Sequence, residues 1–273
     1  MKITLALSKS LEENAGVYFD ASKKAKSKAE GAKEALIETQ KKIDAHLNKQ
    51  QRAERQQQNE QQPLPRRWYH KFRWFITSTG YLAIGGRDAT TNELIVKKHA
   101  KQGDLVFHTE MPGSPFFILK AKGESVGKNL EGTEFDTVSK EELARACATF
   151  SKAWSRHLGT VQVYCVLPDQ IKKEKGLPKG AFMIYGKREY FYADLDLCIG
   201  MDKNQDVMAG PRSAVAAHCE QYMVLTPGNQ KASSIAKDFA AHFGADTDEV
   251  IRSLPGGEFI ILEHVKKSAE VHK

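Results

Sequence analysis

Residues 66–86 read RRWYHKFRWFITSTGYLAIGG, and this stretch decides the fold of the larger part of the chain. It holds two runs rich in aromatic and β-branched residues, which are separated at Thr79-Gly80. Two such runs around a glycine turn predict a β-hairpin. Because side chains alternate along a strand, the first run would carry Phe72 and Trp74 into a core. We therefore expect a strand pair to open a sheet domain.

Two S/T-x-x-E pairs predict helix starts downstream of this hairpin. Thr90 with Glu93 would begin a short helix. Ser139 with Glu142 would begin a longer helix that ends at Gly159. The apolar face expected for the longer helix is formed by Leu143, Cys147, Phe150, Trp154 and Leu158.

Strand-like segments fill most of the remaining chain. They are 104–110, 114–120, 161–167, 181–186, 188–193, 195–200, 221–227 and 258–265. Two further helices are expected over 231–243 and 247–254. Because hairpins interleave with isolated helices, we expect an α+β fold with a mixed, largely antiparallel sheet and packed helices.

The N-terminal part of the chain carries a helical pattern. Small and apolar residues recur at alternating spacings of four and three from Leu11 to Ile43, which is a heptad seam. Ser10 with Glu13 forms a capping box, so we expect one helix over 10–60. Two prolines then end the pattern. The predicted divisions are a coiled-coil arm (1–62), a proline linker (63–65) and a sheet domain (66–273).

Composition narrows the class of protein. The 273 residues are 41% hydrophobic and 27% charged, and no apolar run approaches the ~20 residues of a membrane helix. The N-terminus lacks the apolar core of a secretory signal, so we expect a cytoplasmic protein without a membrane partner. The cysteines form no C-x-x-C pair, and we expect reduced core thiols with no metal and no cofactor. They are Cys147, Cys165, Cys198 and Cys219.

The formal net charge of +7 is concentrated at the N-terminus. Residues 1–67 hold 14 basic and 9 acidic residues, which gives +5 for this part alone. A basic arm on a nearly neutral body favours an anionic partner, of which nucleic acid is the commonest in a cell. A solvated helix whose lysines serve solubility explains the charge equally well, so both interpretations stay open.

Residues 66–74 interleave four cations with four aromatic residues. Surfaces that bind single-stranded RNA use this composition for phosphate contact and base stacking. The same residues also suit an edge strand that exposes Lys71 and Arg73 to water. Composition alone leaves both interpretations open, and the plain strand is the favoured one.

The turn from Gly85 to Asp88 lies between a predicted strand and a predicted helix. Gly85 and Gly86 allow close backbone approach, and the helix start near Asn92 offers N–H groups that can hold a phosphate or a carboxylate. Arg87 would reinforce such an anion site. A plain surface pair between Arg87 and Asp88 is the alternative.

His108 alternates with Asp104 and Glu110 along one predicted strand. This spacing puts the three side chains on one face, where they could hold a metal or act as a base. A structural histidine that bonds to its neighbours is the favoured interpretation. Ser114 is interpreted as a turn residue, because nothing beside it resembles an activating group. We assign no catalytic residue.

Several longer motifs are similar to those of a known family. They are KFRWF (71–75), GGRDATTNE (85–93), KKH (97–99), DLVFH (104–108), GSP (113–115), AFMIYGKR (181–188) and MAGP (208–211). The chain resembles the NFACT-R domain found in NEMF and RqcH relatives. Its GGRDATTNE and FH motifs look like those of the archaeal and eukaryotic branch of the family. The segments 7–10, 13–15 and 28–32 look like the returning helix of that family's long antiparallel coiled coil.

The resemblance implies a role in ribosome-associated quality control. Family members bind an obstructed large ribosomal subunit and peptidyl-tRNA, and several recruit alanyl-tRNA. The ribosome makes the peptide bond, so the resemblance implies an RNA-binding scaffold and no enzyme. The family's NFACT-N part has no counterpart in these residues, so we expect either a separate NFACT-N chain or an antiparallel homodimer through the N-terminal helix.

The expected partners are tRNA and the RNA of the large ribosomal subunit. The candidate residues for phosphate contact are Lys71, Arg73, Arg87, Lys97 and Lys98. Gly85 and Gly86 would allow close backbone approach, and the remaining candidates are Asp88, Asn92 and His108. Two other classes stay open: a protein-interaction or adhesion module, because some bacterial relatives carry a fibronectin-binding label, and a small enzyme built on His108 and Ser114.

Overall fold

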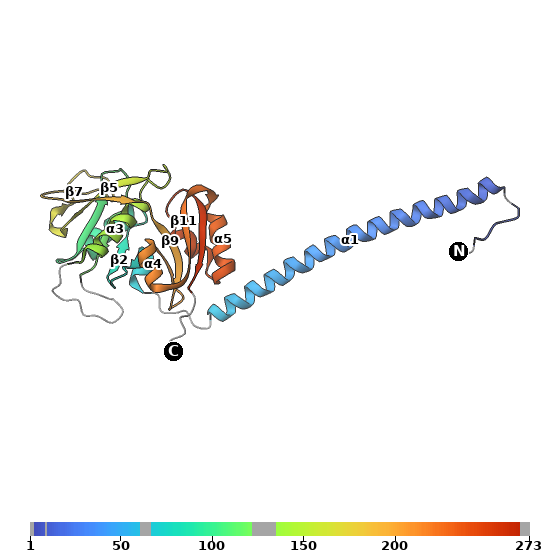
Figure 1. Cartoon of the computed structure of the whole chain (residues 1–273), viewed down its shortest axis with the longest axis horizontal. Coiled ribbons are helices and arrows are strands. Elements are labelled where there is room, and N and C mark those ends of the chain that lie inside the picture. Colours follow the sequence, from blue (N-terminus) through green and yellow to red (C-terminus); the bar gives the residue numbers. More distant parts are fainter. Residues whose placement is uncertain (1–2, 9, 61–66, 122–134, 268–273) are drawn as a thin grey trace. The chain divides into compact units, whose positions relative to one another are not determined.

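The computed structural model describes residues 3–8, 10–60, 67–121 and 135–267, with the backbone alone of 41–42 and 44–60. The chain divides into two compact units, Met1–Arg66 and Arg67–Lys273 (Figure 1). The predicted proline linker lies outside the described residues, and the predicted domain limits stay a prediction.

The N-terminal unit is built on one long helix, α1 (Leu11–Glu60). The predicted capping box begins it, because Glu13 N lies 3.2 Å from the Ser10 hydroxyl and Ser10 N lies 2.8 Å from the Glu13 carboxylate. The residues before the helix fold back along it, and Thr4 N donates to the Tyr18 hydroxyl at 2.9 Å. The single helix is thus confirmed, while its coiled-coil pairing stays a prediction.

Six antiparallel strands form the first sheet of the unit Arg67–Lys273. In spatial order they are β1 (Arg73–Ile76), β2 (Leu82–Gly85), β4 (Phe117–Leu119), β3 (Leu105–Thr109), β5 (Thr160–Val166) and β8 (Glu189–Asp194). The predicted hairpin is confirmed as β1 and β2, where Trp74 pairs with Ile84.

The residues just before β1 form a 3-10 helix, η1 (Trp68–Lys71), where the sequence predicted a strand. Phe72 and Trp74 are buried as predicted. Arg73 is half-buried, so its predicted exposure was wrong. The reason is that its guanidinium folds back over the hairpin and donates to the carbonyl oxygen of Gly86 at 2.7 Å.

The predicted start of the first helix was wrong by two residues. The helix α2 (Ala89–Leu94) begins after Asp88, and a π-helical turn, η2 (Ile95–His99), continues it. The Asp88 carboxylate accepts from Thr91 N at 2.8 Å, while the Thr91 hydroxyl bonds back to Asp88 N at 2.9 Å. An aspartate and a threonine thus provide the reciprocal caps that were assigned to Thr90 and Glu93.

The second predicted helix is α3 (Thr137–Thr149), and both of its ends differ from the prediction. Asp136 caps it by accepting from Ser139 N at 2.7 Å. Glu142 is buried and accepts from Ser78 N at 2.9 Å. A series of turns follows α3 where the helix was predicted to continue to Gly159. The predicted apolar face is buried at Leu143, Cys147, Phe150 and Trp154 and exposed at Leu158.

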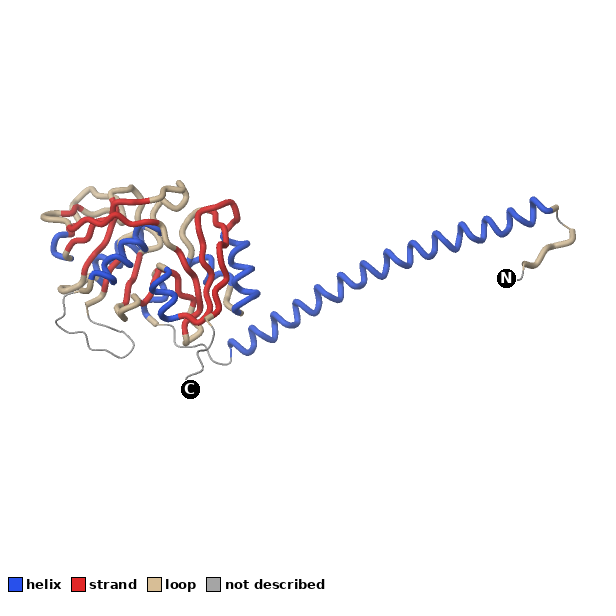
Figure 2. The backbone as a smooth tube through the Cα atoms, in the orientation of Figure 1, coloured by secondary structure: helices blue, strands red, loops and turns tan. Residues whose placement is uncertain are grey.

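A second antiparallel sheet follows in the chain. Its spatial order is β10 (Val207–Gly210), β9 (Leu197–Asp202), β11 (Cys219–Lys231) and β12 (Glu258–Lys266). The predicted C-terminal helices are confirmed as α5 (Ala232–Phe243) and α6 (Thr247–Ser253), whereas β10 and α4 (Arg212–His218) were not predicted. Helix α5 lies along the sheet, against β11 and β12 (Figures 1 and 2).

Small elements complete the unit. A 3-10 turn, η3 (Pro168–Gln170), leads into the two-stranded ribbon β6 (Ile171–Lys172) and β7 (Met183–Ile184). All four cysteines are free and buried, as predicted for core thiols. Burial raises the pKa of the Cys165 thiol to about 12, which keeps it protonated. Among the described residues, no helix combines the length and the apolar character needed to cross a membrane.

Candidate nucleic-acid interface

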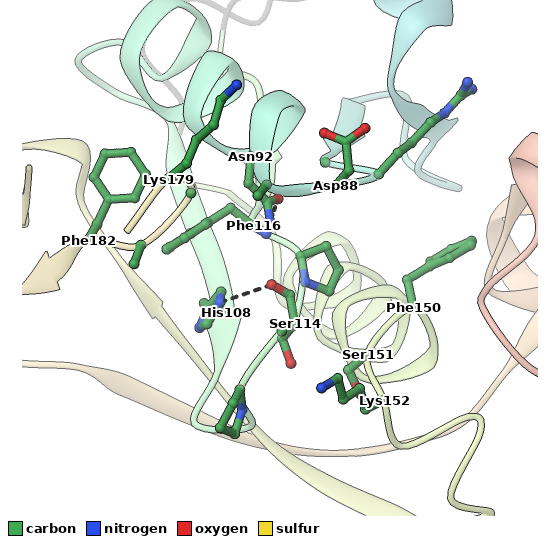
Figure 3. Close-up of a pocket in the computed structure, with 18 of the residues that line it drawn as sticks. Asp88, Asn92, His108, Ser114, Phe116, Phe150, Ser151, Lys152, Lys179 and Phe182 are labelled. Carbon is green, nitrogen blue, oxygen red and sulfur yellow. Dashed lines mark hydrogen bonds between the residues drawn. The ribbon is translucent and has the colours of Figure 1, made fainter. Parts of the chain in front are cut away.

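A pocket of about 800 Å³ opens in the unit Arg67–Lys273. Its walls come mainly from segments 86–92, 112–116, 150–155 and 178–184, which the fold brings together (Figure 3). Six of the predicted site residues line it: Arg73, Gly86, Arg87, Asp88, Asn92 and His108. The predicted residues that do not line it are Lys71, Gly85, Lys97 and Lys98.

Both arginines are held by backbone carbonyls. Arg73 donates to Gly86, and its guanidinium carbon lies 5.0 Å from the centre of the Phe150 ring. Arg87 donates to the carbonyl oxygen of Phe72 at 2.8 Å and to that of His70 at 3.1 Å. Burial lowers the pKa of Arg73 to about 10 and also lowers the pKa of Arg87. Arg73 thus stays charged at neutral pH and adds fixed positive charge beside the pocket.

The two glycines of the turn are required by close packing within the domain. A Cβ at Gly85 would overlap the Phe117 ring, and one at Gly86 would overlap the Asn92 side chain. The Asn92 side-chain oxygen also accepts from Phe116 N at 3.0 Å. Asn92 therefore joins α2 to the residue that precedes β4 at the pocket.

The predicted anion site at the start of α2 is not open to a ligand. The Asp88 carboxylate occupies the N–H of Thr91, and the N–H of Asn92 bonds to the Asp88 carbonyl at 2.8 Å. The hydrogen bond from the backbone N–H of Thr91 is the largest cause that lowers the pKa of the Asp88 carboxyl. The helix start carries a negative charge, which corrects the prediction of free N–H groups for phosphate.

His108 is a half-buried pocket residue in a fixed orientation. Its Nε2 lies 3.2 Å from the Ser114 carbonyl, its Nδ1 lies 3.3 Å from the Tyr164 hydroxyl, and its ring stacks on Phe116 at 4.2 Å (Figure 3). Burial lowers the pKa of His108 to about 4, so the ring is neutral at pH 7. The Ser114 hydroxyl instead bonds to the Thr109 hydroxyl, and the histidine is not placed to activate it.

The predicted alignment of His108 with two carboxylates was wrong. Asp104 precedes β3 and is buried in an ion pair with Lys120. Glu110 follows β3 and pairs with Arg188. The strand is too short to contain all three residues, so each carboxylate turns to its own cation. The favoured interpretation of His108 as a structural histidine agrees with its contacts.

Four further residues line the pocket that were not predicted as site residues from the sequence, two of them aromatic and two cationic. Phe116 and Phe182 meet edge to face at 5.6 Å, and Lys152 and Lys179 are exposed at the pocket (Figure 3). They lie on three separate segments, so no local motif could have joined them. With the two arginines, the described pocket lining holds four basic side chains and one acidic side chain, Asp88.

Glu93 fixes the loop that carries Lys179 and Phe182. Its carboxylate accepts from Gly180 N at 3.0 Å and from Lys173 Nζ at 3.2 Å. A hydrogen bond from Lys97 is the largest cause that lowers the pKa of Glu93, to about 2, and the bonds to the loop add to it. The pocket wall is therefore tied to α2 by an ionised carboxylate.

The predicted residues outside the pocket lie on the surface or in the core. Lys97 is exposed and paired with Glu93 at 2.6 Å, and Lys98 is exposed. Lys71 is exposed, with its Nζ 5.1 Å from the centre of the Phe72 ring. These lysines are accessible to an anionic partner, but they do not share a cavity with the aromatic residues.

Comparison with known proteins identifies the domain. A family model described as NFACT protein RNA binding domain matches residues 71–186. The archaeal Rqc2 homolog aRqcH of Methanocaldococcus jannaschii is 34% identical over 203 residues, which cover 70% of this chain and 29% of the relative. The ribosome quality control complex subunit NEMF of Homo sapiens is 30% identical over 185 residues, which cover 65% and 16%.

The chain spans less than a third of the length of these relatives. A solved structure of the C-terminal part of a fibronectin/fibrinogen-binding protein from Streptococcus suis covers 48% of each chain at 22% identity and a TM-score of 0.39, a similarity too low to assign a fold or a function. The relatives and the matched domain confirm the family resemblance seen in the sequence. The chain is an NFACT-R protein of the RqcH/NEMF family.

Proposed function

We propose that residues 67–273 bind RNA and that the pocket receives an unstacked nucleotide. The observation that carries the proposal is that one cavity joins the half-buried ring of Phe182, which packs edge to face on the buried Phe116, to the exposed cations of Lys152 and Lys179. Aromatic side chains stack on bases, and lysines contact phosphates. A base would lie near the aromatic wall, and its phosphates would lie near the lysines.

The two half-buried arginines have an indirect part in this proposal. Arg73 and Arg87 donate to carbonyls within the domain, so they raise the positive potential of the pocket without leaving their partners. This interpretation differs from the direct phosphate contacts expected from sequence. The neutral ring of His108 would act as a packing surface behind Phe116.

The wider role that we propose is rescue of stalled ribosomes in the cytoplasm. The support comes from the matched RNA-binding domain and from relatives named as ribosome quality control complex subunits. We propose tRNA and large-subunit RNA as the bound partners, and binding without catalysis as the mode of action. The helix α1 would pair with a second helix, supplied by a chain that carries an NFACT-N part or by a second copy.

Fluorescence anisotropy with a labelled single-stranded RNA and a matched duplex tests the pocket. Phe182→Ala should weaken single-strand binding by about 1–3 kcal/mol, because the base no longer has a ring to stack on. Phe182→Leu is the matched control for loop packing, because it keeps the apolar contact with Phe116 but lacks the ring. It should weaken RNA binding like Phe182→Ala while preserving the melting temperature.

Charge reversal separates the pocket from the surface lysines. Lys179→Glu should reduce the slope of log K against log salt by about 0.7 for each phosphate of a single strand that the variant no longer neutralises. Lys98→Glu makes the same charge change on an exposed lysine outside the pocket. If Lys98→Glu reduces the slope and the pocket variants bind as the parent does, RNA lies on the surface predicted from sequence and the pocket proposal is wrong.

A further inference from the structure

A second cluster of chemically active side chains lies outside the pocket. Asp238 and His242 stand one turn apart on α5, and His264 comes from β12. One ligand atom from each residue lies within 4.8 Å of the other two. No metal site was predicted from the sequence. The three residues lie on α5 and β12, which are separated in the chain by α6, so they form no short motif.

The three side chains of the cluster lie close together, at distances wider than those of a closed coordination shell. The Asp238 carboxylate lies 3.5 Å from His264 Nε2. Its distance of 3.6 Å to His242 is to Nδ1, which is not the nitrogen that would bind the ion. The two imidazole rings are 4.7 Å apart. Adjacent ligands on a tetrahedral zinc ion with bonds of ~2.0–2.1 Å are separated by about 3.3 Å. The Asp238–His264 distance is close to this value, and rotation of these two exposed side chains would bring their ligand atoms toward His242 Nε2.

The hydrogen bond of His242 fixes which nitrogen can bind a cation. Its Nδ1 lies 2.8 Å from the backbone carbonyl oxygen of Asp238. A carbonyl oxygen only accepts, so Nδ1 carries the proton and Nε2 keeps a free lone pair. Histidines that ligate a metal commonly donate their other ring N–H to a backbone carbonyl in this way.

We propose that Asp238, His242 and His264 form a binding site for a divalent transition metal, with zinc as the ion that fits best. Two imidazoles and one carboxylate are a ligand set that zinc uses, with water in the fourth position. Side-chain exposures of 39%, 52% and 41% leave the three groups accessible to an ion from solution.

The bound metal would cross-link α5 to β12, the edge strand of the second sheet. Strand β12 pairs only with β11 in the described residues, so its other edge is unpaired within the sheet. Metal bonds from a helix to this edge strand would hold the two elements together and would stabilise the folded state by binding it preferentially. This role is independent of RNA binding at the pocket.

Isothermal titration of the full chain, prepared without a histidine tag and stripped of metal, with zinc chloride tests the site. We expect one zinc ion per chain. His264→Ala and Asp238→Asn should each weaken zinc binding at least about tenfold, because each removes a ligand. His157→Asn is the matched control, since it removes an exposed histidine outside the cluster and asparagine tolerates the positive φ of 54° at this position.

Thermal melting with and without zinc provides a second readout. Zinc should raise the melting temperature of the parent and of His157→Asn, and should leave that of His264→Ala unchanged. Equal zinc binding by all four proteins would overturn the proposal and would mean that the cluster holds only ion pairs between the imidazoles and Asp238. The buried thiols cannot mimic the expected pattern, because they are identical in every variant.

Discussion

Apolar side chains are exposed along the helix α1 but buried in the unit Arg67–Lys273. In the larger unit, the side chains of Phe72 and Trp154 have no exposed surface. On α1, Leu36 of the heptad seam is 71% exposed. The larger unit therefore has its own hydrophobic core, whereas the helix presents an apolar stripe that is exposed at Leu36 and Ile43.

This difference means that the two regions are stabilised in different ways. Burial of apolar surface stabilises the sheet domain by itself. A long helix in water gains little from its own side-chain contacts and depends on packing of its apolar face. Within the described N-terminal unit only local bonds support α1, such as the capping box at Ser10 and the contact of Thr4 with Tyr18. Substitutions should consequently act very differently in the two regions.

The largest expected effect comes from the domain core. Trp74 is 5% exposed and packs against Tyr69 and His70 with ring centres 5.1 and 5.2 Å away. Trp74→Ala should leave a void and reduce the free energy of unfolding by about 3–5 kcal/mol. Calorimetry should show a melting temperature lower by roughly 6–20 °C. A shift within about 2 °C would mean that Trp74 is exposed and would support it as a base-stacking residue.

A pH-dependent effect of the domain follows from His108. Its pKa is lowered to about 4 in the folded state by burial, from about 6.5 in an unfolded chain. As pH falls from 6.5 to 4, the unfolded state binds the additional proton. The free energy of unfolding should thus fall by up to about 1.4 kcal/mol per pH unit in this range.

Urea unfolding at several pH values measures this slope. His108→Gln removes the titrating group, so the difference between parent and variant isolates it from other acids and bases. The slopes should differ between about pH 4 and 6.5 and coincide above pH 7. Equal slopes throughout would show that His108 is solvated and is not held behind the pocket wall.

Glycine substitutions compare the two regions directly. Gly86→Ala would push a methyl group into the Asn92 side chain, which is held by Phe116 N, and should destabilise the domain by about 1–3 kcal/mol. Gly16→Ala on α1 meets no atom within 4 Å and should stabilise the helix by roughly 0.5–1 kcal/mol. Circular dichroism at increasing temperature should show opposite signs, and equal signs would contradict the contrast.

Sequence patterns predicted the elements of the fold better than their ends. The hairpin around Thr79-Gly80 and the helix α1 follow from periodicities that are local in the chain. The helix starts at Asp88 and Asp136 were misplaced because two capping residues lay close together in each segment. Which one caps is decided by tertiary contacts, such as the burial of Glu142 against Ser78 N.

The candidate site was predicted only in part for a related reason. Arg73, Asn92 and His108 were selected from local composition and motifs, and they do line the pocket. Phe182 and Lys179 reach it because Glu93 holds their loop to α2, and this contact joins residues 87 positions apart. Patterns of residue spacing along the chain cannot predict a contact between residues so far apart in the sequence. The sequence also predicted that Arg87 contacts phosphate, whereas in the folded domain its guanidinium donates to backbone carbonyls.

The smallest effect on folding is expected from the exposed seam of α1. Leu36→Glu replaces a side chain that is 71% exposed, so it should change the free energy of unfolding of the domain by less than about 0.5 kcal/mol. The same change should abolish any pairing of α1, because a charge in a heptad seam must be desolvated against the partner helix. Sedimentation velocity of the parent and the variant separates these effects, and Glu38→Gln tests a charge change at a nearby position outside the seam. A dimer that dissociates only in Leu36→Glu would identify a second copy as the partner. A melting temperature of the domain several degrees lower would contradict the small effect expected for this substitution.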